Sequence, residues 1–262
     1  MLTLDAIERY RTLAAARGPL LVATDLDGTL APIVAHASDA RVPESTLAVL
    51  DRLSQVARVA VITGRDLNTA RRLVPVEGVV VVGSHGLEAS FDHPLIPGVD
   101  RVALSAALER IEQQVISAVP SSFLHIERKA ISTAFHYRAA PDLEDPLRKA
   151  LANLPEGLRL REGRMVLEVI PDARGGKDLA ITALARHVKC KSLLVMGDDA
   201  TDVAMFRASL ELAKTDGIHV LLAGVSGGPE TPPEIVELAD VVLRSTSEAL
   251  EGLETLARAL GV

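Results

Sequence analysis

Cysteine, aromatic residues and clustered positive charge are all scarce in this chain of 262 residues. The one cysteine, Cys190, excludes an internal disulfide and a metal site built from several thiolates, and its place near a predicted strand favours a buried, inert thiol. Aromatic residues make up 2% of the sequence, so stacking platforms for bases or sugar rings are few. A formal net charge of −7 without a block rich in lysine or arginine argues against nucleic acid and anionic membranes as partners.

Long apolar runs are missing as well. No stretch of about 18 consecutive apolar residues occurs, and the N-terminal segment mixes charges into the region where a secretion signal is apolar. We therefore expect a cytoplasmic protein that does not insert into a membrane. Hydrophobic residues make up 48% of the chain, which is enough for one large domain or for a core with a smaller inserted domain.

Short apolar, β-branched runs alternate with segments of helical periodicity. Strands are predicted at 20–24, 59–63, 79–83, 193–197, 218–223 and 241–244, and helices at 44–57, 66–73, 176–188 and 202–209. This alternation is typical of a Rossmann-like α/β fold, in which helices cover both faces of a parallel sheet. Ligands of such folds bind beyond the carboxyl ends of the strands.

Residues 99–172 follow a different rhythm. A long helical segment at 100–118 is followed by strands at 123–127 and 131–138, a helix at 142–153, and a strand pair at 158–162 and 166–170. We interpret this segment as a smaller α+β domain inserted into the parallel α/β core.

The most informative motif is Asp-Leu-Asp-Gly-Thr-Leu at 25–30, directly after the first predicted strand. Two carboxylates two positions apart on an extended segment lie on the same side. Asp25 can attack phosphorus and hold a divalent cation, while Asp27 can deliver and retrieve a proton at the leaving oxygen. Gly28 has no side chain, so we expect its amide to approach a phosphate oxygen closely. The alternative is a strand that ends in an ordinary polar turn, which Asp-Gly alone would favour.

Further polar groups stand at other strand ends and helix starts. Thr63 and Asp198 lie at or just past the ends of predicted strands, and Lys177 follows two glycines at the start of a predicted helix. The helix dipole disfavours a lysine there, so its position favours a ligand role. The segment 198–202 could serve as a helix cap, but a cap needs one polar residue and this segment supplies four. We expect these groups to meet at one edge of the sheet.

Together these motifs resemble the haloacid dehalogenase superfamily, and specifically the trehalose-6-phosphate phosphatase family. Its four motifs occur in order, as the motif at 25–30, Thr63-Gly64-Arg65, Lys177 after Gly175-Gly176, and Gly197-Asp198-Asp199-Ala200-Thr201-Asp202. More than a hundred residues separate the second and third motifs, where a cap domain would be inserted. The resemblance implies a haloacid dehalogenase-like catalytic core of residues 1–98 and 173–262, and an α+β cap of residues 99–172 for substrate recognition.

The resemblance also implies a function. It is the Mg²⁺-dependent hydrolysis of trehalose 6-phosphate to trehalose and phosphate through an aspartyl-phosphate intermediate, the last step of trehalose biosynthesis. The implied catalytic residues are Asp25 as nucleophile, Asp27 as general acid and base, Thr63 as hydroxyl donor to the phosphate and Lys177 as fixed positive charge. The implied Mg²⁺ ligands are Asp25, the carbonyl of Asp27 and Asp198, with Asp199 and Asp202 in supporting positions or at the helix N-terminus.

The expected substrate-binding residues lie on both domains. On the core they are Gly28, Gly64, Arg65 and His85, and on the cap they are Glu127, Lys129, His136, Arg138 and Glu168. Strand alternation predicts that Glu127 and Lys129 share one face and that His136 and Arg138 lie together on another. The alternative for these cap residues is a solvated strand with cross-strand ion pairs.

Two departures from the family pattern and several rival functions stay open. No arginine follows Glu168 closely, and Val203 and Ala204 stand where the family often has acidic residues. The rival functions are a phosphatase of another glycosyl phosphate (glucosylglycerol, mannosylglycerate or sucrose phosphate), a phosphosugar mutase, and a non-catalytic protein that binds a sugar phosphate. A small-molecule sugar phosphate is the expected partner, and a functional link to a trehalose-phosphate synthase is a further hypothesis.

Overall fold

The computed structural model describes residues 1–34, 36–90, 101–129, 131–163, 165–172, 175–227 and 231–262. The chain forms two compact units, which we call the core unit (Met1–Leu95 with Gly175–Val262) and the insert unit (Ile96–Arg174). The domain boundaries predicted at 98/99 and 172/173 involve residues outside the described ranges. Within those ranges, no helix is both long and apolar enough to cross a lipid bilayer.

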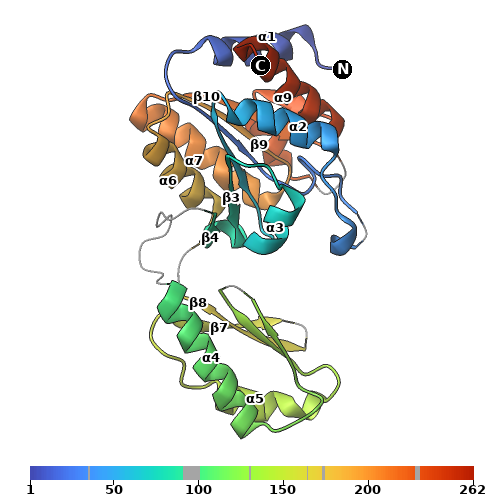
Figure 1. The fold of residues 1–262 in the computed structure, drawn as a ribbon, viewed down its shortest axis with the longest axis vertical. Helices are drawn as coiled ribbons and strands as arrows, with labels where there is room; N and C mark the ends of the chain where they lie inside the picture. The colour runs from blue at the N-terminus through green and yellow to red at the C-terminus, as the bar shows by residue number, and fades with distance from the viewer. Residues whose placement is uncertain (35, 91–100, 130, 164, 173–174, 228–230) are drawn as a thin grey trace. The chain divides into compact units, whose positions relative to one another are not determined.

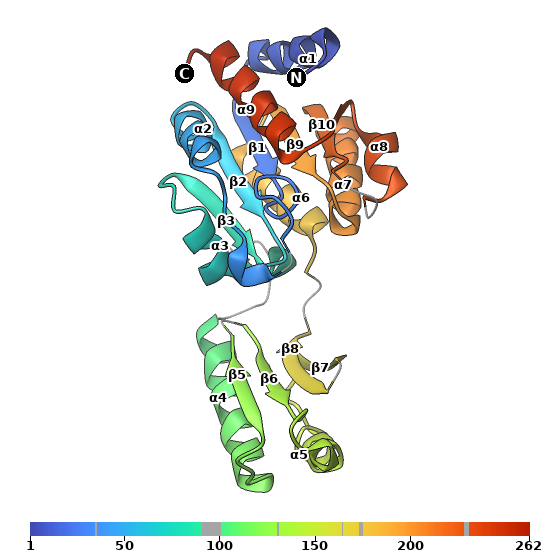
Figure 2. The ribbon, with the colours of Figure 1, turned by 90° about the vertical axis from the view of Figure 1, so that its right-hand side faces the viewer.

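In the described part of the core unit, seven strands form one sheet. Figures 1 and 2 show this sheet at the centre of the unit. Its spatial order is β11 (Val241–Leu243), β10 (His219–Val225), β9 (Ser192–Gly197), β1 (Leu20–Thr24), β2 (Arg58–Ile62), β3 (Val79–Gly83) and β4 (Glu88–Ala89). Neighbouring strands are parallel except β4, which is antiparallel to β3. The six predicted strands and the parallel α/β class are confirmed, whereas the two-residue β4 has no apolar run to indicate it.

Helices cover both faces of this sheet (Figure 1). On one face, α1 (Leu4–Ala15) and α2 (Glu44–Ser54) both pack against α9 (Thr246–Leu260), and on the other α6 (Lys177–Val188) packs against α7 (Ala200–Asp216). Two shorter helices, α3 (Leu67–Leu73) and α8 (Pro233–Leu238), pack beside β3 and β10. Helix α7 is longer than the predicted segment 202–209, and α1, α8 and α9 lie outside the predicted segments.

The register of the central strands brings three functional segments to one edge. Thr24, the last residue of β1, pairs with Val61 of β2 and with Met196 of β9. Strands β1, β2 and β9 therefore end within one residue of one another at the carboxyl edge of the sheet. Nearly every side chain of these strands is buried, and because apolar packing on both faces opposes a slip, this register is strongly specified.

The insert unit is an α+β unit. Its elements follow in the order α4 (Arg101–Ala118), β5 (His125–Arg128), β6 (Thr133–His136), α5 (Glu144–Ala150), β7 (Leu158–Gly163) and β8 (Val166–Pro171). The strands form an antiparallel sheet in the order β5-β6-β8-β7. Phe135 and Leu167 are paired in register and fully buried, as are Leu108 of α4 and Leu147 of α5, so both helices contribute to this unit's own core.

Candidate active site

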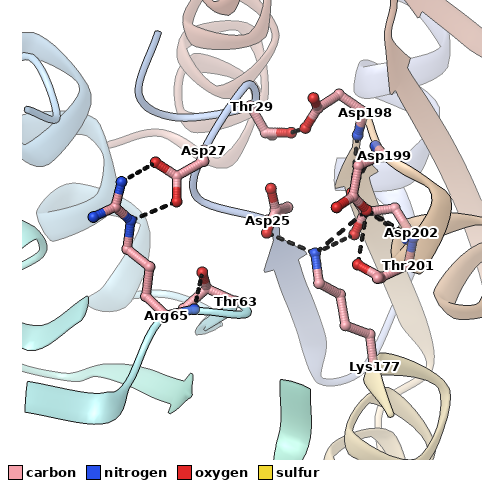
Figure 3. Close-up of polar contacts among 10 residues, drawn as sticks. All are labelled: Asp25, Asp27, Thr29, Thr63, Arg65, Lys177, Asp198, Asp199, Thr201 and Asp202. Carbon is pink, nitrogen blue, oxygen red and sulfur yellow. Dashed lines mark hydrogen bonds and ion pairs between the residues drawn. The ribbon is translucent and has the colours of Figure 1, made fainter. Parts of the chain in front are cut away.

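The carboxyl ends of β9, β1 and β2 bring Asp198, Asp25 and Thr63 into one group of side chains (Figure 3). Each is the first residue after its strand, and their exposed fractions are 7%, 4% and 1%. Lys177, the first residue of α6, enters the same group. The residues that four separate motifs place at strand ends and at a helix start are thus brought together by the fold.

Lys177 lies between two buried carboxylates. Its Nζ atom is 2.7 Å from Oδ1 of Asp25 and 2.7 Å from Oδ1 of Asp202. Burial lowers the pKa of Lys177, but the charges of these carboxylates outweigh burial and raise the pKa above its ordinary value. Burial raises the pKa of Asp25, against the lowering effect of the Lys177 ammonium. Lys177 therefore stays charged at neutral pH and reduces the repulsion between Asp25 and an approaching anion.

The turn between β9 and α7 is held by its own acidic side chains. Asp199 is the N-cap of α7, and its carboxylate accepts hydrogen bonds from the amides of Thr201 and Asp202. Oδ2 of Asp202 accepts hydrogen bonds from the amides of Asp198 and Asp199, which completes a capping box. The Asp198 carboxylate accepts a hydrogen bond from the Thr29 hydroxyl at 3.0 Å. The segment is therefore both a helix cap, through Asp199, and part of the site, through Asp198.

The arrangement of the acidic side chains fits a divalent cation. Asp25, Asp198 and Asp202 are buried and have carboxylate oxygens within 4.8 Å of one another. Burial and the neighbouring Asp202 raise the pKa of Asp198 to about 6. The single charge of Lys177 neutralises only part of three carboxylates, and hard oxygen donors with excess negative charge are what Mg²⁺ prefers.

Asp202 lies within this group, although the family resemblance implies a supporting position for it. Both of its oxygens already accept hydrogen bonds, Oδ1 from Lys177 and Oδ2 from the amides of Asp198 and Asp199. These bonds favour the supporting position, in which Asp202 fixes Lys177 and the turn that carries Asp198.

The Asp27 carboxylate is turned toward Arg65 (Figure 3). Nε of Arg65 donates to Oδ2 of Asp27 at 2.6 Å and Nη2 donates to Oδ1 at 2.7 Å, which makes a bidentate pair. The Arg65 amide donates to the Thr63 hydroxyl at 3.2 Å. Arg65, expected to contact the substrate, here holds the expected general acid in place.

Gly28 serves a different purpose from the predicted one. Its amide donates to the Ala31 carbonyl at 2.7 Å within the turn, so it is not directed at a phosphate. Glycine is required there because φ is +83° and because a Cβ atom would lie 2.1 Å from Oδ2 of Asp198. The structure thus corrects the prediction: the missing side chain makes room for the Asp198 carboxylate.

His85 lies against Gly64, where a Cβ atom would come within 2.5 Å of the imidazole ring. The His85 amide donates to the Thr63 carbonyl at 3.0 Å, which ties this turn to the second motif. One pocket of about 690 Å³ is lined by the expected residues Asp25, Asp27, Thr63, Gly64, Arg65, His85, Lys177 and Asp199. Ser38, Asp66, Thr69 and Arg72 line the same pocket, and sequence reasoning missed them because they belong to no motif.

Charged side chains form a row across one face of the insert sheet. Glu127 of β5 lies opposite Ala134 of β6, Ala134 opposite Glu168 of β8, and Glu168 opposite Arg161 of β7. Directly paired residues share a face, and so does His136, two positions beyond Ala134. Nε2 of His136 is 3.0 Å from Oε2 of Glu127, so the prediction that His136 lies on a different face from Glu127 is wrong.

Glu168 is held from three sides. Lys129 (3.1 Å) and Ser132 (2.7 Å) donate to its Oε1, and Arg161 donates to its Oε2 (3.2 Å). Burial would raise the pKa of Glu168, but these donors hold it below its ordinary value. Arg161 was missed because the β7–β8 pairing, not the sequence next to Glu168, places it there. Strand β6 ends at His136, which leaves Arg138 in an exposed turn rather than on a strand face.

A haloacid dehalogenase-like hydrolase of Bacteroides thetaiotaomicron has the same fold, with a TM-score of 0.54 over 90% of this chain and 99% of that chain at 12% identity. The solved structure of Aspergillus fumigatus trehalose-6-phosphate phosphatase shares this fold, with a TM-score of 0.58 over 97% of each chain at 23% identity. The model of the trehalose-phosphatase family matches residues 23–235. The chain belongs to this family, and membership classes it as a phosphatase, a phosphoric monoester hydrolase.

Curated relatives agree with this assignment. A probable trehalose-phosphate phosphatase of Sinorhizobium fredii (strain NBRC 101917 / NGR234) is 33% identical over 192 residues, covering 70% of this chain and 71% of that protein. A trehalose-phosphate phosphatase of Mycolicibacterium paratuberculosis is 32% identical over 249 residues, covering 90% of this chain and 59% of that protein. The chain also spans 16% of a longer Mycobacterium tuberculosis protein described as an uncharacterized glycosyl hydrolase.

Proposed function

We propose that this chain is a Mg²⁺-dependent phosphatase that hydrolyses trehalose 6-phosphate to trehalose and phosphate through an aspartyl-phosphate intermediate, the last step of trehalose biosynthesis. The observation that carries the proposal is the contact between Lys177 and Asp25 beside Asp198. It combines a buried carboxylate nucleophile, a fixed ammonium and enough acidic oxygens for a divalent cation. Membership of the trehalose-phosphatase family supports the choice of leaving group.

The positions of the side chains support one role for each of them in this proposal. Asp25 attacks phosphorus, and Lys177 keeps Asp25 ionised and stabilises charge on the phosphoryl oxygens. Thr63, on the wall of the same pocket, donates its hydroxyl to a phosphoryl oxygen. Asp27 protonates the departing sugar oxygen and then takes a proton from the water that hydrolyses the aspartyl phosphate.

Arg65 controls when Asp27 can act. Arg65 donates to both oxygens of the Asp27 carboxylate, so this pair has to open before Asp27 can reach the leaving oxygen and pass a proton to it. The phosphate of an incoming substrate is itself a bidentate partner for arginine. Substrate binding is therefore expected to draw Arg65 away from Asp27.

The ligands that we assign to Mg²⁺ are the carboxylates of Asp25 and Asp198 and the carbonyl of Asp27, with Asp199 and Asp202 supporting the turn. When bound, the cation supplies positive charge to the phosphoryl oxygens. The charge excess of the carboxylates over Lys177 supports this assignment.

The leaving group in this proposal is a neutral disaccharide. Glu127 and Glu168 on the insert sheet accept hydrogen bonds from hydroxyl groups, while Lys129 and Arg161 donate them. Such polar pairs suit a sugar in a chain with few aromatic residues. A cytoplasmic location and a functional link to a trehalose-phosphate synthase accompany this function as further hypotheses.

A panel of sugar phosphates tests the proposal. Phosphate release is measured from the phosphates of trehalose, sucrose, glucosylglycerol and mannosylglycerate, with Mg²⁺ or with EDTA. We expect the highest kcat/KM for trehalose 6-phosphate and loss of turnover in EDTA. A preference for another glycosyl phosphate contradicts the substrate, an isomeric sugar phosphate without free phosphate indicates a mutase, and binding without turnover indicates a non-catalytic protein.

The nucleophile is tested by Asp25→Asn, which keeps the shape of the side chain and removes its charge. We expect kcat to fall by about 10⁴-fold or more. Asp51→Asn, at an exposed position of α2, is the control and should keep full activity. Undiminished turnover by Asp25→Asn would show that another group attacks phosphorus.

A further inference from the structure

The pocket at the carboxyl edge is larger than phosphoryl transfer requires. Its volume of about 690 Å³ is within the roughly 300–1,000 Å³ of small-molecule sites, and a phosphoryl group fills only a small part of it. Besides the catalytic groups, the lining contains Ser38 of η1 (Ala37–Asp39), Asp66 before α3, and Thr69 and Arg72 on α3. The mechanism above gives none of these four residues a task.

Three of these residues form a polar wall along α3. Asp66, Thr69 and Arg72 are three positions apart in succession, so they lie on one side of the helix. Oδ1 of Asp66 accepts a hydrogen bond from the Thr69 amide at 2.9 Å, and Nη2 of Arg72 donates to the Thr69 hydroxyl at 2.9 Å. Leu67 and Ala70 are buried in the core and anchor the helix. The wall is thus fixed by its own hydrogen bonds and by packing behind it.

The wall presents donors and acceptors without net charge. Burial would raise the pKa of Asp66, but the hydrogen bonds from Thr69 and the charge of Arg72 hold it below its ordinary value, so Asp66 is ionised. Arg72 is exposed, and its guanidinium has more donors than the Thr69 hydroxyl accepts. Thr69 adds a hydroxyl group to the wall, and Ser38 of η1 adds a second hydroxyl group to the same pocket lining. One anion, one cation and two hydroxyls suit a neutral compound with many hydroxyl groups.

We propose that Ser38, Asp66, Thr69 and Arg72 form a leaving-group subsite on the core unit, which binds hydroxyl groups of the neutral sugar that carries the phosphate. The four residues line the same pocket as Asp25 and Lys177, so a sugar attached to a phosphate at Asp25 would lie in the pocket that they line. This inference rests on the proposed function, because it assumes that the pocket hydrolyses a sugar phosphate.

Arg72→Ala tests the subsite, with Arg71→Ala as a matched control. Arg71 is the exposed neighbour on the same helix and is not part of the pocket lining. Each variant is assayed with trehalose 6-phosphate and with p-nitrophenyl phosphate, whose leaving group carries no sugar hydroxyls. We expect Arg72→Ala to lower kcat/KM for trehalose 6-phosphate by about tenfold, the equivalent of one hydrogen bond to a charged group, mostly through KM. Its kcat/KM for p-nitrophenyl phosphate and both values of Arg71→Ala should stay within about twofold of the original chain.

An equal loss on both substrates, or no loss on either, overturns the subsite. A second variant, Asp66→Asn, keeps a residue that caps helices well and should lower kcat/KM for trehalose 6-phosphate selectively, without a change in the unfolding temperature. If the original chain prefers another neutral sugar phosphate, the proposed substrate fails while the subsite is tested on that compound. A preference for sugar phosphates whose leaving group is itself an anion overturns the subsite independently.

Discussion

Replacing Gly28 by alanine tests how tightly the first motif is fitted to Asp198. The new Cβ atom would lie 2.1 Å from Oδ2 and 2.5 Å from Cγ of Asp198, whereas real Cβ contacts are essentially never shorter than 3.0 Å. The carboxylate would therefore have to move by about 0.9 Å, the difference between 3.0 and 2.1 Å. It has little room to do so, because Asp198 is 7% exposed and bonded to Thr29.

Two separate effects of Gly28→Ala lower the free energy of unfolding. A side chain at φ +83° costs about 1–2 kcal/mol. Loss of the hydrogen bond between the buried Thr29 and Asp198 costs about 1–3 kcal/mol more. We expect a total loss of roughly 2–4 kcal/mol, since the two costs will overlap in part. A displacement of this size at an expected Mg²⁺ ligand should also lower kcat/KM by about 100-fold and raise the Mg²⁺ concentration required.

Urea unfolding measures the first effect, and phosphate release over a Mg²⁺ titration measures the second. Gly157→Ala is the matched control, because Gly157 has φ +84° and no described atom lies within 4 Å of an added Cβ. The control should lose only about 1–2 kcal/mol and keep its kcat/KM. If the two variants behave alike in both assays, the steric argument about Asp198 is refuted.

Two further substitutions probe charges. Lys177→Met leaves the carboxylates of Asp25 and Asp202 buried without their ammonium partner. The free energy of unfolding, measured in urea, should therefore fall by about 3–5 kcal/mol. Unchanged stability would contradict the pairing. Hydrogen bonds from Arg244 lower the pKa of Glu248 to about 2. The charge of Glu248 therefore stabilises the fold fully at pH values above the ordinary glutamate pKa, and this stabilisation decreases as the pH falls toward 2. Glu248→Gln should therefore cost about 1 kcal/mol at pH 7 and clearly less near pH 2 in thermal unfolding, whereas an equal loss at both pH values would indicate packing.

The core sheet could be predicted because parallel strands covered on both faces are continuous apolar runs. Strand β1, for example, is buried at every position. Helix α9 carries an equally regular signal, with Ala249, Leu253 and Leu256 buried on one side, and it could have been found. Helix α8 is different, since six residues after a proline give too short a pattern to identify.

The core of the site could be predicted because each motif is local and ends a strand or begins a helix. Contacts between residues that only folding brings together could not be predicted. Arg65 lies 38 positions from Asp27, and nothing in either motif indicates that the guanidinium would pair with that carboxylate. The task of Gly28 likewise depends on Asp198, which comes from another strand. Arg161 could be identified only from the structure, in which the register of β7 and β8 places it opposite Glu168.

The net charge differs between the catalytic groups around Asp25 and the polar surfaces that we propose to bind the sugar. Beside Asp25, carboxylates outnumber the ammonium, which favours a divalent cation. The α3 wall has no such excess, because Asp66 and Arg72 cancel.

The insert sheet is balanced in the same way, because Glu127 and Glu168 are matched by Lys129 and Arg161. Each of these two polar surfaces, taken by itself, therefore disfavours a leaving group that carries its own negative charge. Among the rival substrates, this argues against mannosylglycerate phosphate, whose glycerate is an anion, and leaves the neutral sugars for the substrate panel to distinguish.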